Sequence, residues 1–154
     1  MSTVTIRSAA TGDALAVSAL LTELGYPIPA SSVPDRVERL MATGWATALV
    51  AVDGTPVGLV TGHVLPVLHA DGQVARLTAL VVAPSARGRG VGRRLVEAIE
   101  GWARSKGCAR IAVTTAQHRT GAHAFYERIG YEHTGRRYAK MLDRADLGPD
   151  LCAP

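Results

Sequence analysis

A turn rich in glycine and arginine is the part of this sequence best suited to chemistry. Residues 80–95 read LVVAPSARGRGVGRRL, so an apolar run leads through Pro84 into three glycines and four arginines. Glycine lets an anion approach the main chain because it has no Cβ, and the start of a helix leaves several N–H groups without partners. With the helix dipole and the arginine charges, this pattern predicts a phosphate-binding site.

Two common phosphate-binding motifs do not fit this turn. A P-loop requires G-x-x-x-x-G-K-[ST], which is absent from the sequence. A dinucleotide fingerprint requires G-x-G-x-x-G, and Arg93 stands where its third glycine belongs. The pattern that remains is R-x-x-G-x-G, formed by Arg87, Gly90 and Gly92.

Hydrophobic periodicity predicts alternating strands and helices around the turn. The helices expected from three- and four-residue spacing cover 14–24, 34–42, 91–107 and 121–130. The strands expected from apolar or alternating runs cover 3–7, the runs on either side of Asp53–Gly54, 74–82, 108–115 and 137–142. A helix that joins two strands after an antiparallel meander predicts one mixed sheet covered by helices.

Length and composition narrow the class of protein. With 154 residues, 47% hydrophobic and 19% charged, the chain can bury one sizeable core, and no apolar run approaches the ~18 residues of a membrane span. We expect a single domain over 1–142 and a loosely held tail over 143–154. The N-terminus has no secretory pattern, so a cytoplasmic location is expected. Cys108 and Cys152 are not expected to form a disulfide.

The charge pattern argues against a nucleic acid partner, and the absence of a long apolar run argues against a membrane partner. The net charge is +4, but only 5% of residues are aromatic, and the densest basic cluster surrounds one turn instead of spreading along a surface. Such a cluster suits a compact polyanion better than a duplex.

The turn and a motif some thirty residues after it resemble the GNAT superfamily of acyl-CoA-dependent N-acyltransferases. The stretch LTALVVAPSARGRGVGRRLVEAIEGWARSKGC is similar to motif A of that family, and AHAFYERIGY is similar to its A-x-x-F-Y-x-x-x-G-[FY] signature. The resemblance covers about residues 3–142. It implies the GNAT fold, an α/β (α+β) domain with a single mixed, mostly antiparallel sheet of six to seven strands flanked by about four helices.

The resemblance also implies acetyl-CoA as co-substrate, without a metal ion. The turn would hold the CoA pyrophosphate, and the strand before it would pair with the pantetheine arm. A bulge near Val82 would aim an N–H at the thioester oxygen. Arg119, at a position where the family often has asparagine, would be a further contact with CoA. The other residues assigned to the cofactor are Leu80, Val81, Val82, Arg87, Gly88, Arg89, Gly90, Val91, Gly92 and Arg93.

Acyl transfer to an amine requires a base for the ammonium, donors for the oxyanion and an acid for the leaving thiolate. The resemblance assigns the acid to Tyr126, with a buried core aromatic as the structural alternative. Many relatives carry a glutamate base where this chain has Arg76, and arginine cannot accept a proton at neutral pH. His63 is the first replacement, followed by His118 and Glu23.

The expected reaction is direct transfer of an acetyl group to a primary amine of a small molecule in a ternary complex. Neither cysteine is placed beside a base, so a covalent intermediate is not expected. A protein or peptide amine, or a non-catalytic acyl-CoA sensor, are the alternatives. Arg76 could bind a carboxylate or phosphate of the acceptor or be a solvated edge residue. The resemblance makes a homodimer reasonable, and it leaves the acceptor unnamed.

Overall fold

The computed structural model describes residues 3–115 and 117–142, and the chain divides after Val113 into two compact units. The expected tail, with Cys152, lies outside the described residues. The strands of the first unit are β1 (Thr5–Ser8), β2 (Ala46–Asp53), β3 (Thr55–Pro66), β4 (Gln73–Val82) and β5 (Cys108–Val113). Its helices are α1 (Ala14–Leu24), α2 (Val33–Ala42) and α3 (Val91–Ser105), and the second unit holds α4 (Thr120–Arg128).

The sheet is mixed, as expected, with the strand order β1-β2-β3-β4-β5. Neighbouring strands are antiparallel except for β4 and β5, which are parallel and are joined through α3. The GNAT-like α/β architecture is therefore confirmed, but the described chain has five strands instead of six or seven. Residues 137–142, expected as the last strand, have no strand structure, because alternation of side chains alone does not supply a hydrogen-bonded neighbour.

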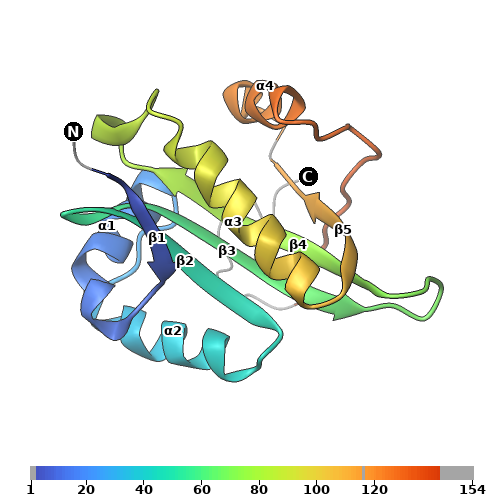
Figure 1. Ribbon diagram of the computed structural model, residues 1–154, viewed down its shortest axis with the longest axis horizontal. Helices are drawn as coiled ribbons and strands as arrows, with labels where there is room; N and C mark the ends of the chain where they lie inside the picture. The colour runs from blue at the N-terminus through green and yellow to red at the C-terminus, as the bar shows by residue number, and fades with distance from the viewer. Residues whose placement is uncertain (1–2, 116, 143–154) are drawn as a thin grey trace. The chain divides into compact units, whose positions relative to one another are not determined.

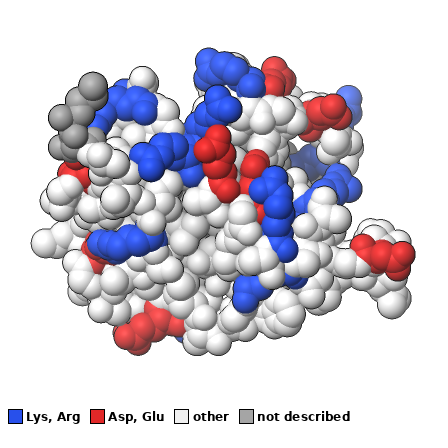
Figure 2. Space-filling view, in the orientation of Figure 1, with Lys and Arg blue, Asp and Glu red and all other residues white. Residues whose placement is uncertain are grey.

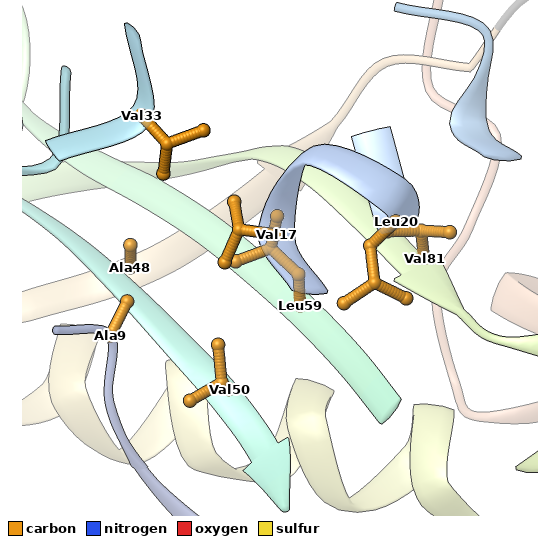
Figure 3. Close-up of a cluster of buried hydrophobic side chains, with 8 residues drawn as sticks. All are labelled: Ala9, Val17, Leu20, Val33, Ala48, Val50, Leu59 and Val81. Atoms are coloured by element: carbon orange, nitrogen blue, oxygen red, sulfur yellow. The ribbon is translucent and has the colours of Figure 1, made fainter. Parts of the chain in front are cut away.

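Helices α1 and α2 cover one face of the sheet. Val17 and Leu20 of α1 and Val33 at the start of α2 pack against side chains of β2, β3 and β4 (Figure 3). The strand residues in this cluster are Ala48, Val50, Leu59 and Val81. Because side chains alternate along a strand, these residues define which positions of each strand face α1 and α2.

Helix α3 crosses the opposite face of the sheet (Figure 1). It buries Leu95, Val96 and Ile99, which are at most 1% exposed. A Cβ built on Gly58 of β3 would lie only 2.8 Å from Leu95 Cδ1. Glycine in this strand therefore lets the helix approach closely, and this packing fixes the first turn of α3 beside the end of β4.

Candidate functional site

The glycine-arginine turn has a backbone that favours glycine at two positions. Gly88 has a φ of 74° and Gly90 a φ of 75°, both in the left-handed region. Open space surrounds both Cα positions within the described structure, so backbone conformation, and not crowding, explains these glycines. Gly90 is the N-cap of α3. The turn therefore leads the chain from β4 into the helix with its main chain uncovered.

The first turn of α3 offers unpaired N–H groups. Gly90 provides no side-chain cap, and the helical hydrogen bonds begin with Arg94 N–H, which donates to the Gly90 carbonyl at 3.1 Å. In the described parts of the chain, the N–H groups from Gly88 to Arg93 have no acceptor. These donors lie at the positive end of the α3 dipole, so the turn can bind an anion through its backbone.

Among the described strands, the end of β4 next to this turn has an open edge. Pairing between β4 and β5 ends at Leu77 and Val113, so Thr78 to Val82 have no partner from β5. On the other side, the Ala83 N–H donates to the Val57 carbonyl at 2.8 Å. Antiparallel alternation then turns the polar groups of Val81 toward β3 and those of Leu80 and Val82 toward the open edge. Val81 is thus unable to offer main-chain hydrogen bonds to an added strand.

The bulge expected near Val82 lies instead at Thr78. Thr61 of β3 pairs with Ala79 and Gly62 pairs with Leu77, which leaves Thr78 as the extra residue, whereas Val82 pairs regularly with Gly58. The hydroxyls of Thr61 and Thr78 lie 2.7 Å apart and share a hydrogen bond. The bulge therefore marks the point where β5 leaves β4, at the far end of the open edge.

The arginines of the turn are largely balanced by carboxylates. Arg87 Nη2 lies 2.8 Å from Glu23 Oε1, and Arg87 Nε donates to the Val82 carbonyl at 3.1 Å. Arg89 pairs with Asp53 at 2.9 Å. Arg93 pairs with Glu97 of its own helix at 3.0 Å, and Figure 2 shows basic and acidic side chains beside one another on the face that carries α3. The backbone is therefore the more open part of this candidate anion site.

Polar side chains of β3 and β4 lie on the face opposite α3, beyond the core cluster. His63 pairs directly with Arg76, and Thr61 and Thr78 follow along the same two strands. Burial and the neighbouring Arg76 guanidinium lower the pKa of His63. The imidazole is therefore neutral at pH 7 and able to accept a proton.

Tyr126 lies in the second unit, on α4. Its side chain is buried, and its ring makes edge contacts with Phe125 at 5.2 Å and Tyr131 at 5.5 Å between ring centroids. Burial raises the pKa of Tyr126 to about 12, against the opposing effect of Arg119. The phenol is therefore protonated at neutral pH, as a general acid must be. Arg119 is the N-cap of α4, and His118 before it is exposed.

Other candidate groups give no sign of a nucleophile or metal centre. Cys108 is a free, half-buried thiol, and burial raises its pKa, which keeps it in the unreactive protonated form. Among the described residues, no three His, Cys, Asp or Glu side chains are grouped to hold a metal ion. In the same part of the chain, no helix combines the length and hydropathy required to cross a bilayer.

Sequence reasoning missed the links between distant elements. Glu23 and Arg87 are 64 positions apart, and Thr61 and Thr78 are 17 apart. No local pattern signals either pair, because each depends on how helices and strands pack. The glycine spacing, by contrast, was a sufficient signal for the turn.

Comparisons with known proteins agree with this architecture. The family model of the acetyltransferase (GNAT) family matches residues 19–131. The aminoglycoside N(6')-acetyltransferase type 1 of Salmonella typhimurium is 30% identical over 115 residues, covering 73% of this chain and 79% of that protein. The aminoalkylphosphonate N-acetyltransferase of Salmonella typhimurium is 33% identical over 90 residues, which is 58% of each chain.

Solved structures share the fold over nearly the whole chain. A protein described as a transcriptional regulator from Bacillus halodurans C-125 is 29% identical, with a TM-score of 0.79 over 90% of this chain and 100% of that one. The aminoglycoside N-acetyltransferase AAC(6')-Iy in complex with CoA has a TM-score of 0.81 at 24% identity, over 92% of this chain and 95% of that one. From the family match and the sequence relatives together, the chain belongs to the GNAT family of acetyltransferases and is an acyltransferase.

Proposed function

We propose that the protein transfers an acetyl group from acetyl-CoA to a primary amine of a small molecule. The observation that carries the proposal is the continuity between the open edge of β4 and the uncapped start of α3. The relatives named as acetyltransferases of aminoglycosides and of aminoalkylphosphonates support a small-molecule acceptor.

The backbone of the turn and strand fits the two polar parts of CoA. The N–H groups from Gly88 to Arg93 would hold the pyrophosphate, and Arg94, whose side chain is exposed, could add charge. The Leu80 carbonyl and the Val82 N–H would pair with the pantetheine arm, while Val81 contributes packing from the core. From Val82 to Thr78 the edge includes five residues, and the four steps between them span about 13 Å at strand spacing. Bound acetyl-CoA would supply the activated acetyl group.

The oxyanion donor is assigned to Leu80 N–H. Val82 lies next to the turn, and its carbonyl is held by Arg87, so its N–H lies at the pyrophosphate end of the edge. Leu80 is closer to the bulge at Thr78, where the edge ends. A fixed N–H at that position would favour developing negative charge without reorganising.

Tyr126 and His63 are assigned the two proton transfers. Tyr126, with a pKa of about 12, would donate a proton to the departing thiolate and later recover one from solvent. His63, neutral because its pKa is lowered, would take a proton from the amine directly or through water. Arg119, the N-cap of α4, is assigned as a further residue that binds the cofactor.

The test is release of free thiol from acetyl-CoA in the presence of single amines. The panel contains small aliphatic amines, an aminoglycoside and a lysine-containing peptide, with a sample lacking amine as control. Amine-dependent thiol release, with mass spectrometry of the acetylated product, is the expected result for at least one small amine. Acetyl-CoA binding without turnover of any amine would overturn the proposed enzyme activity, and turnover of the peptide alone would overturn the small-molecule acceptor.

A further inference from the structure

The sheet face opposite α3 carries two arginines beside the end of the open edge. His63, Arg76 and Ala112 are paired in one row across β3, β4 and β5. Arg110 pairs with Val74, two residues before Arg76 on β4, and so shares the face of Arg76. Standard strand spacings put the Cα atoms of the two arginines about 8 Å apart.

These arginines differ from those of the turn because, among the described residues, neither is paired with a carboxylate. Both side chains are exposed, and within residues 3–115 and 117–142 neither forms an ion pair. Strands β3, β4 and β5 contain no aspartate or glutamate. By contrast, Arg87, Arg89 and Arg93 each hold a carboxylate. This part of the sheet therefore has positive charge available for an anionic ligand.

The position of Arg76 and Arg110 on the sheet bears on how an acceptor amine would approach the acyl group. Helix α3 covers the other face of the sheet, and α1 and α2 cover the core cluster nearer to Val81. The face around Thr78, Arg76 and His63 lies at the end of the open edge that is farthest from the turn. An amine attacking an acyl group held there would pass over these side chains.

We propose that the acceptor is a small primary amine that also carries a carboxylate, phosphonate or phosphate group, which Arg76 binds with support from Arg110. The proposal rests on the proposed function. A guanidinium binds such anions through two parallel, charge-assisted hydrogen bonds, which also orient the rest of the molecule. Two nearby cations disfavour polycationic amines by like-charge repulsion. The charge on this face therefore selects the acceptor and turns its amine toward the acyl group.

Three amines of similar size but different charge provide the first arm of the test. They are 2-aminoethylphosphonate, β-alanine and ethanolamine, and ethylenediamine serves as a cationic fourth. We expect kcat/KM to be at least tenfold higher for one of the two anionic amines than for ethanolamine, and lowest for ethylenediamine. The comparison of phosphonate with carboxylate identifies the anion. Equal kcat/KM for all four amines, or a preference for a neutral or cationic amine, would overturn the proposal.

Variants of Arg76 provide the second arm. R76Q should raise KM for the anionic amine at least tenfold with a smaller change in kcat, and should leave the Kd of acetyl-CoA unchanged. R76E should reverse the preference between anionic and cationic amines. The matched control is R104Q, since Arg104 is an exposed arginine of α3 on the other face. An R76Q enzyme with an unchanged KM for the anionic amine would contradict the assignment.

A binding measurement separates this inference from the proposed function. If no amine supports thiol release, the proposed function fails, and methylphosphonate and propionate are then titrated into the protein while the His63 imidazole signals are followed by NMR. Saturable shifts that are absent in R76Q support an anion site at Arg76. Absence of any shift with either anion overturns the site, whatever the activity.

Discussion

Arg87 joins the end of β4 to α1 through one side chain, with its Nη2 atom 2.8 Å from Glu23 Oε1 and its Nε atom 3.1 Å from the Val82 carbonyl oxygen. The first arginine of the R-x-x-G-x-G pattern therefore contacts both the strand that precedes the turn and helix α1. Both side chains of the ion pair are substantially exposed, so the pair itself adds little to stability. The main consequence of the two Arg87 contacts is to fix the end of β4 and the turn relative to α1.

Replacing Arg87 should therefore weaken cofactor binding more than folding. We expect R87Q to raise the Kd of acetyl-CoA by about 10- to 100-fold, since a lost charge-assisted contact corresponds to about 1.5–3 kcal/mol. The Tm should change by less than a few degrees. Calorimetry of acetyl-CoA binding, with R104Q as control, checks this, and an unchanged Kd would contradict a role for Arg87 at the turn.

Gly90 and Gly101 form a matched pair for testing the backbone of the turn. Gly90 has a φ of 75°, whereas Gly101 lies inside α3, and a Cβ at either position would meet open space. G90A should destabilise the protein by about 1–2 kcal/mol and weaken acetyl-CoA binding. G101A should stabilise it by up to about 1 kcal/mol and leave binding unchanged. Thermal unfolding and calorimetry measure both, and equal binding losses would count against a specific role for Gly90.

Asp13 should make folding sensitive to acid. This carboxylate is 7% exposed, pairs with Arg7 at 2.7 Å and accepts the Ala10 N–H, and the Arg7 hydrogen bond is the largest cause of its lowered pKa. A lowered folded-state pKa gives stability that is complete above the unfolded value of about 3.9 and is lost as pH falls through the folded value.

The substitution D13N tests this contribution directly. We expect a loss of about 1–2 kcal/mol at pH 7, since Arg7 is half-exposed and solvent screens the pair. The difference between wild type and D13N should shrink as the pH falls below about 4. Urea unfolding at several pH values provides the measurement. A difference that stays constant down to pH 2 would exclude the ion pair as its source.

His63 should set the acid limb of the pH–rate profile. The charged group that faces it is Arg76 on β4, while Ala46, opposite it on β2, is uncharged. Because the base acts when neutral, kcat/KM should fall as pH decreases through the lowered pKa, below about 6.5. R76Q should move this limb to higher pH, and H63Q should abolish it. A limb that is unchanged in H63Q would assign the base to another group.

Tyr126 should affect the chemical step and not the affinity for acetyl-CoA. We expect Y126F to lower kcat by about 10²–10⁴, the usual range for loss of a general acid. The matched control is Y138F, because Tyr138 is 86% exposed. Steady-state kinetics with acetyl-CoA and an active amine gives the comparison. If Y126F retains full kcat, Tyr126 is a packing residue of α4, in contact with Phe125 and Tyr131.

The elements and the turn were predictable because their signals are local. The three- and four-residue spacing of Val17, Leu20 and Leu24 gave the bounds of α1, and the glycine spacing located the start of α3. The bulge was misplaced because its position depends on the register with Thr61 of β3. The prediction of a strand at 137–142 was wrong for a related reason. An alternating pattern shows which face of a strand could be buried, but it does not identify a neighbouring strand to pair with.

The candidate site was predictable only in part for the same reason. The positive φ of Gly88 and Gly90 was predictable from their residue type, because glycine adopts the left-handed region readily. The contacts of Arg87 with Glu23 and of His63 with Arg76 depend on strand register and helix packing, which a single sequence does not encode locally. The presence of Arg76 at the position of the expected glutamate was visible in the sequence, but the residues that surround Arg76 in the fold were not.

The most direct measurement is a reaction of acetyl-CoA labelled in the acetyl group with 2-aminoethylphosphonate or β-alanine, mixed with enzyme in excess. The account predicts that the label appears in the amide product in one step that requires both substrates, that free CoA forms in equal amount, and that no label is attached to the protein. Labelled protein formed before the amine is added would contradict direct transfer. No labelled amide with these or any other small amine would contradict the proposed activity itself.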